Sequence, residues 1–392
     1  MKIPTDFAAF FKQAHFSELT PIQAQVYQPF LDQQSFLALA PTGSGKTLAF
    51  GMPLIQQVEA GQGIQKLILE PSQELAIQTR DVLRQLAPQL SIYAVIGGAN
   101  LKRQIAQLKT KPEIVVGTLG RVSDLVQQRK LKLNRVTGVV IDEADELLSE
   151  KMDPIRALIS RLDRKVQLNF FSATSAAIFS QLSQYFGREI GQFDLRGDQE
   201  FRAGLKHYFL AVPNKKKVEL LQRLAHRKQK RTLVFCQSSK QLHQLAADLR
   251  YRKLYYMVLD TSDPKRRREE ALRSLRQHQT SLLLTTDVAA RGMDIPDLTT
   301  VINWENPQTA TAYTHRSGRT GRMGRAGEVI TLGNQHDYRQ LQTLLRPQAI
   351  TVKWAQLQAG KLQAVAKFPQ KKGAPVKSQS STKNKSRRSP KK

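Results

Sequence analysis

The sequence predicts an α/β protein with two parallel-sheet domains in tandem, followed by a disordered basic tail. Its 392 residues exceed what one ordinary hydrophobic core holds. Short apolar runs alternate with helical patterns along most of the chain, and this scheme occurs twice. From Lys367 onward there are ten Lys and Arg residues and no acidic residue. Such a segment cannot bury a core, so we expect it to be disordered.

The first half contains six apolar runs of strand length, with helical patterns between several of them. Residues 73–86, for example, read QELAIQTRDVLRQL. Strands that alternate with helices favour a parallel sheet covered on both faces. The predicted strands are 36–40, 66–70, 92–96, 113–117, 138–142 and 167–172.

The second half repeats this alternation, with helical patterns over 216–228 and 240–253. We therefore divide the chain into a first domain, a linker, a second domain and the tail, over 1–195, 196–205, 206–350 and 351–392. Ligands of open α/β sheets bind beyond the carboxyl ends of the strands, and two such domains suggest a cleft between them. The predicted strands are 207–212, 232–236, 255–259, 281–286, 299–304 and 328–332.

The charge balance indicates a polyanionic partner. The chain carries 61 Lys and Arg against 32 Asp and Glu, a formal net charge of +29, and removing the tail's ten charges still leaves +19. Nucleic acid is the first candidate for such a partner. No apolar run approaches the ~18 residues of a membrane span, and no signal peptide is evident. The only cysteine is Cys236, which favours a reducing compartment. We expect a cytoplasmic monomer without membrane association.

Residues 40–47, APTGSGKT, follow the first predicted strand and precede a helical pattern. They match the phosphate-binding loop GxxxxGK[ST] except at Ala40. Gly43 and Gly45 would let backbone N–H groups surround phosphate oxygens, Lys46 would reach the β- and γ-phosphates, and Thr47 would hold Mg²⁺. The alternative is an ordinary Gly- and Ser-rich turn. The predicted nucleotide contacts here are Ala40, Thr42, Gly43, Ser44, Gly45, Lys46 and Thr47.

Four carboxylates follow the fifth predicted strand, in VVIDEADELL at 139–148. A nucleotide phosphate needs a hard cation, and a hard cation needs oxygen ligands. Asp142 would therefore bind Mg²⁺ through water, and Glu143 would orient or deprotonate the attacking water. Asp145 and Glu146 are interpreted as structural salt-bridge residues. The alternative is an acidic helix N-terminus, which the helix dipole favours.

These motifs, in this order, resemble the DEAD-box ATP-dependent RNA helicases of superfamily 2. APTGSGKT is followed by DEAD at 142–145, SAT at 172–174, TTDVAARGMD at 285–294 and HRSGRTGR at 315–322. Together the motifs cover about residues 15–330. The resemblance implies two RecA-like domains that bind ATP and Mg²⁺ between them and RNA across them.

The resemblance also assigns roles to single residues. Gln23, in TPIQ at 20–23, would select adenine, and Asp294 would bind the ribose. Ser172 and Thr174 would couple hydrolysis to strand separation. Arg319 and Arg322 would act as arginine fingers at the γ-phosphate, while Arg316 ranks second for that role. The implied RNA contacts, which are sequence-independent, are Pro71, Gly97, Gly98, Thr118, Gly120, Arg121, Ser238, Arg268, Thr286 and Gly292.

The chain departs from the family pattern mostly on the RNA side. His15 and Leu19 alter the adenine-binding segment, and the upstream aromatic residue of the family is missing. The other departures are Gln73, Leu119, Asp260-Thr261 and Lys265. We expect a working ATPase with unusual RNA contacts. The alternatives are a DNA-directed helicase and an RNA clamp or annealing chaperone timed by ATP. Ribonucleoprotein or ribosomal-precursor partners are compatible with each RNA-directed alternative.

Overall fold

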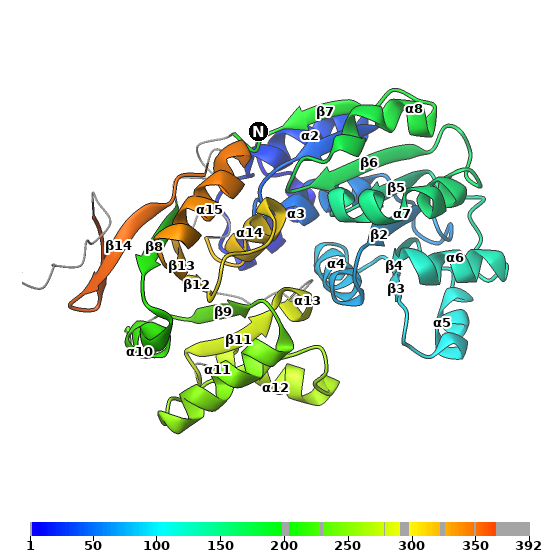
Figure 1. Cartoon of the computed structure of the whole chain (residues 1–392). Coiled ribbons are helices and arrows are strands. Elements are labelled where there is room, and N and C mark those ends of the chain that lie inside the picture. Colours follow the sequence, from blue (N-terminus) through cyan, green and yellow to red (C-terminus); the bar gives the residue numbers. More distant parts are fainter. Residues whose placement is uncertain are drawn as a thin grey trace, which may run out of the picture.

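The computed structural model describes residues 2–197, 204–227, 230–277, 279–290, 298–321, 326–348 and 350–365 (Figure 1). Two mainly parallel sheets form two domains in tandem. The first sheet has the order β3-β4-β2-β5-β6-β1-β7, and the second has the order β10-β11-β9-β12-β13-β8-β14-β15. Only β14 and β15 pair antiparallel among the described strands. The predicted fold class is therefore confirmed for the described residues.

The first domain alternates strands and helices as the sequence predicts. Its elements are η1 (Thr5–Phe7), α1 (Ala8–Gln13), α2 (Pro21–Leu31), β1 (Phe36–Leu39), α3 (Lys46–Gln56), β2 (Lys66–Glu70), α4 (Gln73–Leu86), β3 (Ile92–Val95), α5 (Leu101–Leu108), β4 (Ile114–Thr118), α6 (Leu119–Gln127), β5 (Gly138–Ile141), α7 (Ala144–Ile159), β6 (Gln167–Ser172), η2 (Ala177–Gln181), α8 (Leu182–Phe186) and β7 (Gly191–Asp194).

The second domain repeats the alternation and ends in two further strands. Its elements are β8 (Leu205–Ala211), η3 (Asn214–Lys216), α10 (Lys217–Ala225), β9 (Thr232–Cys236), α11 (Ser239–Tyr251), β10 (Met257–Leu259), α12 (Lys265–Arg276), β11 (Leu282–Thr286), α13 (Asp287–Ala290), β12 (Thr300–Asn303), α14 (Ala310–Ser317), β13 (Gly327–Gly333), α15 (Gln335–Leu345), η5 (Arg346–Gln348), β14 (Lys353–Gln358) and β15 (Lys361–Ala364).

Each sheet separates two hydrophobic cores. In β1, Phe36 and Ala38 join one core, whereas Leu37 and Leu39 join the other. Alternate side chains of a strand point to opposite faces, so a central strand must be apolar throughout. The same division occurs in β9 of the second domain. The cores hold the sheets rigid and so fix the positions of the loops at their carboxyl edge.

Three strands lie outside the predicted set, and two of them correct the predicted tail. β7 extends the first sheet beside β1, and β14 pairs with β8 in the second sheet. Residues 353–364 therefore belong to the second sheet, although the prediction placed them in a disordered tail. Residues 366–392 lie outside the described part. In the described part, no helix is long and apolar enough to cross a membrane.

Trp354 anchors β14 to the second domain. Its ring centroid lies 3.8 Å from that of Tyr338 and 5.1 Å from that of Phe209. We expect Trp354→Ala to lower the free energy of unfolding by about 3 kcal/mol, the low end for a buried aromatic, because Trp354 is only half-buried. Tyr251→Ala is the control, since Tyr251 is 91% exposed. Urea unfolding measures both, and equal stability of the two variants would contradict the role of Trp354.

Candidate active site

The predicted nucleotide residues of the first domain gather at one end of its sheet. The phosphate loop, the DEAD segment and the SAT segment follow β1, β5 and β6, and these strands are neighbours in the order β5-β6-β1. The strands are parallel, so their carboxyl ends meet at one edge. The predicted RNA residues of this domain follow β2, β4 and β3 along the other half of the same edge.

The phosphate loop has the backbone that an anion site requires. Gly43 and Gly45 have φ of 81° and 89°, a left-handed conformation that glycine adopts readily. α3 begins directly after Gly45, so its free N–H groups face the loop. Lys46 is buried, and its Nζ donates to the carbonyl of Ala40 at 3.2 Å. The Ser44 hydroxyl is buried without a hydrogen-bond partner among the described residues. These features fit a bound polyphosphate.

Gln23 connects the adenine-binding segment to this loop. Its side chain is fully buried and accepts a hydrogen bond from the Thr20 backbone N–H, which closes a capping box at the start of α2. Its Nε2 donates to the carbonyl of Gly45 at 3.2 Å. Gln23 is thus held beside the phosphate loop, and its contact with adenine stays a prediction.

The first two acids of the DEAD segment lie where β5 ends and α7 begins. Asp142 is buried, and its carboxylate accepts from the backbone N–H of Glu143 at 2.9 Å. Burial, followed by the nearby charge of Glu143, raises the pKa of Asp142 to about 7, although Lys46 opposes this shift. Glu143 has φ of +45°, which turns the chain sharply into α7. A buried carboxylate in this setting suits a divalent cation, so Asp142 fits the predicted Mg²⁺ role.

Asp145 ties the DEAD segment to the SAT segment. The Thr174 hydroxyl donates to the Asp145 carboxylate. Ser172 donates to the Thr174 carbonyl at 2.8 Å and accepts from the Thr174 N–H at 3.2 Å. The prediction of a structural salt bridge for Asp145 is wrong, because in the described structure its carboxylate is bound by a hydroxyl group. The DEAD and SAT segments are therefore joined by a direct hydrogen bond between their side chains.

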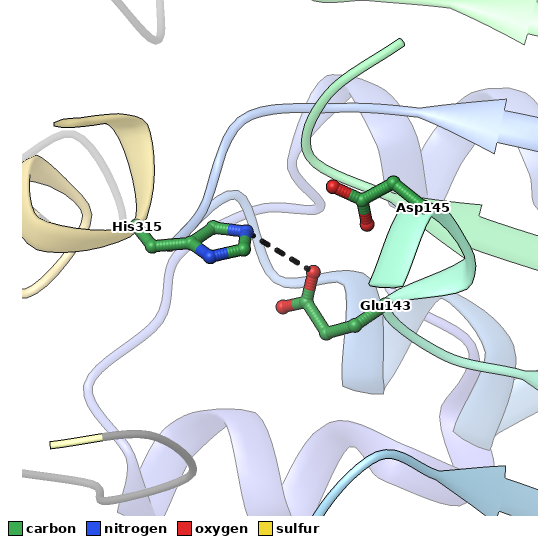
Figure 2. A group of neighbouring side chains, drawn as sticks. All are labelled: Glu143, Asp145 and His315. Carbon is green, nitrogen blue, oxygen red and sulfur yellow. Dashed lines mark ion pairs between the residues drawn. The ribbon is translucent and has the colours of Figure 1, made fainter. Parts of the chain in front are cut away.

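The second domain brings α14 against these loops. The Thr42 hydroxyl donates to the carbonyl of Thr314 at 3.1 Å. His315 Nε2 lies 3.9 Å from Glu143 Oε2, and Figure 2 shows the imidazole pointing across the gap toward this carboxylate. A cleft of about 670 Å³ lies between the domains, with Asp145 and Arg319 among its lining residues. The predicted interdomain cleft is therefore present.

The two described arginines of the HRSGRTGR segment have different surroundings. Arg316 is 2% exposed and makes a bidentate ion pair with Asp287, at 2.6 Å for both contacts. It also donates to Asn303 at 3.0 Å and lies over the Phe235 ring. Arg319 is half-buried and lines the interdomain cleft. Arg316 therefore supports the second domain from within, and the arginine-finger roles stay predictions.

Comparison with known proteins agrees with this geometry. Residues 20–181 match the family model of DEAD/DEAH box helicases, and residues 216–324 match that of the helicase conserved C-terminal domain. The DEAD-box ATP-dependent RNA helicase CshC of Bacillus cereus is 33% identical over 335 residues, which span 84% of this chain and 86% of the relative. The chain belongs to the DEAD-box helicase family.

Other relatives and solved structures are also similar to this DEAD-box chain. The probable ATP-dependent RNA helicase YfmL of Bacillus subtilis is 34% identical over 351 residues, spanning 88% of this chain and 93% of the relative. A DEAD box protein from Methanococcus jannaschii has a TM-score of 0.58 at 31% identity, covering 90% and 97% of the two chains. Dbp5 of S. cerevisiae, bound to RNA and ADP BeF3, shares the fold with a TM-score of 0.77 at 24% identity over 90% and 93%.

The predicted RNA residues lie on loops and helix starts of the DEAD-box fold. Thr118 ends β4 and precedes α6, where Arg121 donates to the carbonyl of Ala99 at 3.3 Å. Ser238 caps α11, and the buried Thr286 accepts from the N–H of Ala289. The remaining described members are Pro71, Gly97, Gly98 and Gly120, which lie after β2, after β3 and in α6. Their RNA contacts stay predictions.

The structure does not describe the side chains of four predicted site residues. Gly292, Asp294 and Arg322 lie outside the described residues, and of Arg268 only its position in α12 is described. The predicted roles of these four side chains therefore stay predictions.

Two residues that the prediction passed over are His315 and Gly318. Both lie inside the HRSGRTGR segment, so this motif could have drawn attention to them in the sequence. His315 faces Glu143 across the cleft. Gly318 packs against the phosphate loop so closely that an added Cβ would lie 1.7 Å from Thr42 Oγ1 and 2.1 Å from Thr42 Cβ. Glycine is therefore required there for the domains to approach.

Substitution of Gly318 tests this interdomain contact. Because the methyl group of Gly318→Ala would overlap Thr42, we expect an overpacking cost of about 1–3 kcal/mol, which disfavours the closed arrangement by roughly 5–150-fold. ATP turnover should fall by a similar factor. Gly197→Ala is the control, since its added Cβ meets nothing within 4 Å. Adding Thr42→Gly to Gly318→Ala should relieve the overlap, and wild-type turnover in Gly318→Ala alone would contradict this account.

Asp260 stands where the family usually has His. It is fully buried and accepts from the hydroxyls of Ser239 and Thr261, at 3.0 and 3.2 Å, and from the backbone N–H of Ser262. His243 Nε2 lies 3.2 Å from its other oxygen. Although burial alone would raise the pKa of Asp260, these hydrogen bonds and His243 together lower it. The departure from the family pattern is thus accommodated by a local network around the start of α11.

Proposed function

We propose that this DEAD-box protein is an ATP-dependent RNA helicase that opens short duplexes locally and couples ATP hydrolysis to the approach of its two domains. The observation that carries the proposal is the 3.9 Å approach of Glu143 in the first domain to His315 in the second, beside an interdomain cleft that His315 and Arg319 line. A site divided in this way is complete only when the domains are together. Hydrolysis therefore depends on domain closure.

The first domain supplies the binding half of the site. The backbone of the phosphate loop and Lys46 would hold the β- and γ-phosphates, with the N-terminus of α3 behind them. Thr47 and Asp142 would hold Mg²⁺, which when bound neutralises charge on the phosphate oxygens. Gln23 would position the adenine. The unpartnered Ser44 hydroxyl and the raised pKa of Asp142 support this assignment.

The remaining catalytic groups come from both domains. Glu143, in the first domain, would accept a proton from the attacking water, and Figure 2 shows its carboxylate directed toward His315 of α14. Arg319 would place its guanidinium against the charge that develops on the γ-phosphate, and we propose the same role for Arg322. His315 would fix the carboxylate of Glu143. None of these contacts is complete without α14.

The link between Asp145 and Thr174 supports coupling between hydrolysis and RNA. It connects the acids at the end of β5 to the loop after β6, on the same edge that carries the predicted RNA residues. RNA would lie across both domains on the face away from ATP, held by its sugar-phosphate backbone. Closure of the domains would bend the bound strand and separate it from its complement.

Stimulation of the ATPase tests the proposal. We expect RNA to stimulate ATP turnover and single-stranded DNA of the same sequence to stimulate it much less. We also expect ATP-dependent displacement of a short RNA strand from its duplex. Equal stimulation by RNA and DNA would favour a DNA-directed enzyme instead. RNA annealing without any duplex displacement would favour the clamp or chaperone.

We also propose a cytoplasmic, monomeric protein that acts on ribosomal precursors or other ribonucleoproteins. The buried position of Cys236, its only cysteine, suits a reducing compartment. The net charge of +29 suits RNA-rich partners with little sequence preference. Sedimentation of cell extracts with and without ribonuclease would test the association, which should disappear when RNA is digested.

A further inference from the structure

Three side chains that could bind a metal ion meet where the two domains approach each other. They are Glu143 at the start of α7, Asp145 in its first turn and His315 on α14 (Figure 2). One ligand atom from each lies within 4.8 Å of the others. The first two come from the first domain and the third comes from the second. The cluster therefore exists only when the domains are together.

Each of the three side chains has one buried polar atom that lacks a hydrogen-bond partner among the described residues. Asp145 is 6% exposed, and its Oδ1 has no partner in the described structure, whereas the Thr174 hydroxyl binds the carboxylate through Oδ2. Glu143 Oε2 and His315 Nε2 are also buried without a hydrogen bond, and only a 3.9 Å contact joins them. Buried polar atoms seldom stay unpaired, because desolvation without a partner costs about 1–3 kcal/mol each. Three such side chains whose ligand atoms lie within 4.8 Å of one another indicate a ligand.

The charge around the cluster favours a cation. The segment 142–146 contributes four carboxyl groups. Among the described residues, Lys46 opposes this charge from the phosphate loop, and Arg316 and Arg319 line the cleft. A proton on His315 would satisfy Glu143 at most and would leave Asp145 Oδ1 unpaired. A multivalent cation can satisfy all three atoms together.

We propose that Glu143, Asp145 and His315 bind one divalent transition-metal ion, with zinc as its representative, and that this ion bridges the two domains. Imidazole with two carboxylates suits zinc, whereas Mg²⁺ prefers oxygen ligands alone. Zinc lies about 2.0–2.2 Å from such ligands, so tetrahedral ligand atoms are about 3.3 Å apart. Each side chain must move by about 1 Å or less from its present position, and water completes the coordination. This site is separate from the one proposed for Mg²⁺ at Thr47 and Asp142.

The proposed ion would hold the domains together and occupy the carboxylate of Glu143. Zinc that binds before ATP would then inhibit ATP turnover, because the carboxylate of Glu143, the proposed base, is no longer available. This consequence depends on the proposed function, but binding of the ion does not. Zinc binding is therefore measured without ATP or RNA.

The test is a titration of zinc into the tag-free full chain, against a competing chelator and without nucleotide. We expect one zinc ion per wild-type chain. His315→Ala and Asp145→Asn should each weaken binding by at least about 10–100-fold, the loss seen when even outer-sphere partners of a metal site are removed. Asparagine keeps an acceptor for Thr174, so Asp145→Asn preserves that contact. His243→Ala is the matched control, since His243 also faces a buried carboxylate, that of Asp260, at 3.2 Å.

A second measurement guards against misfolded variants. Zinc should raise the thermal unfolding temperature of the wild type and of His243→Ala but not of His315→Ala, while the metal-free proteins unfold at similar temperatures. Unchanged zinc affinity in both His315→Ala and Asp145→Asn would overturn the proposal. So would an equal loss of affinity in His243→Ala. Failure of RNA to stimulate ATP turnover would count against the proposed helicase function and would leave these binding results unaffected.

Discussion

Glu143→Gln should lower ATP turnover by about 10²–10⁴-fold, the usual contribution of a general base, while ATP and RNA still bind. The carboxylate lies at the start of α7 and faces the interdomain cleft, where His315 Nε2 is 3.9 Å away. Glutamine keeps the size and polarity of this side chain but cannot accept the proton of the attacking water. The variant should therefore accumulate in complex with ATP and RNA. Single-turnover hydrolysis and binding of a fluorescent ATP analogue measure the two properties separately.

The matched control for this variant is Glu150→Gln. Glu150 lies in the same helix and is exposed, so its substitution should leave turnover unchanged. Substantial turnover in Glu143→Gln would show that another group activates the water. A parallel loss of ATP binding would show instead that Glu143 holds the nucleotide, and the role of base would then pass to a different residue.

The buried strands were predictable because their environment is uniform. β6 and β9 lie at their predicted bounds of 167–172 and 232–236. Both are buried along their whole length, and a strand covered on both faces must be apolar at every position. Two of the edge strands, β7 and β15, do not meet this condition. β7 reads GQFD and β15 reads KLQA, both are largely exposed, and neither differs in composition from a loop.

The motif residues of the first domain were predictable because each follows a strand whose position was clear. The pairing of the domains was not predictable from the same patterns. The contact of Thr42 with Gly318 and that of Glu143 with His315 join residues from different domains, and no local periodicity encodes them. The role of Asp145 was missed for a related reason. Its partner, Thr174, follows another strand, so the local sequence favoured a structural salt bridge for Asp145 and did not indicate a hydroxyl partner.

Arg319→Ala should lower ATP turnover by about 10³–10⁵-fold, as for the loss of an arginine finger. Arg319 is half-buried and lines the cleft between the domains, three residues after Arg316. Arg319→Lys keeps the positive charge but loses the planar fork that binds two phosphate oxygens together, so its activity should lie between those of the wild type and the alanine variant. Turnover under saturating ATP and RNA measures this series.

Arg316→Ala provides the contrast that decides between a catalytic and a structural role. Arg316 is buried and pairs with Asp287 and Asn303 inside the second domain, so its loss should cost about 3 kcal/mol of unfolding free energy. Arg319→Ala should lower the free energy of unfolding less than Arg316→Ala, because Arg319 is only half-buried and lines the cleft between the domains. If the two variants showed the opposite pattern, the arginine that reaches the γ-phosphate would be Arg316, and its ion pair with Asp287 would have to break for catalysis.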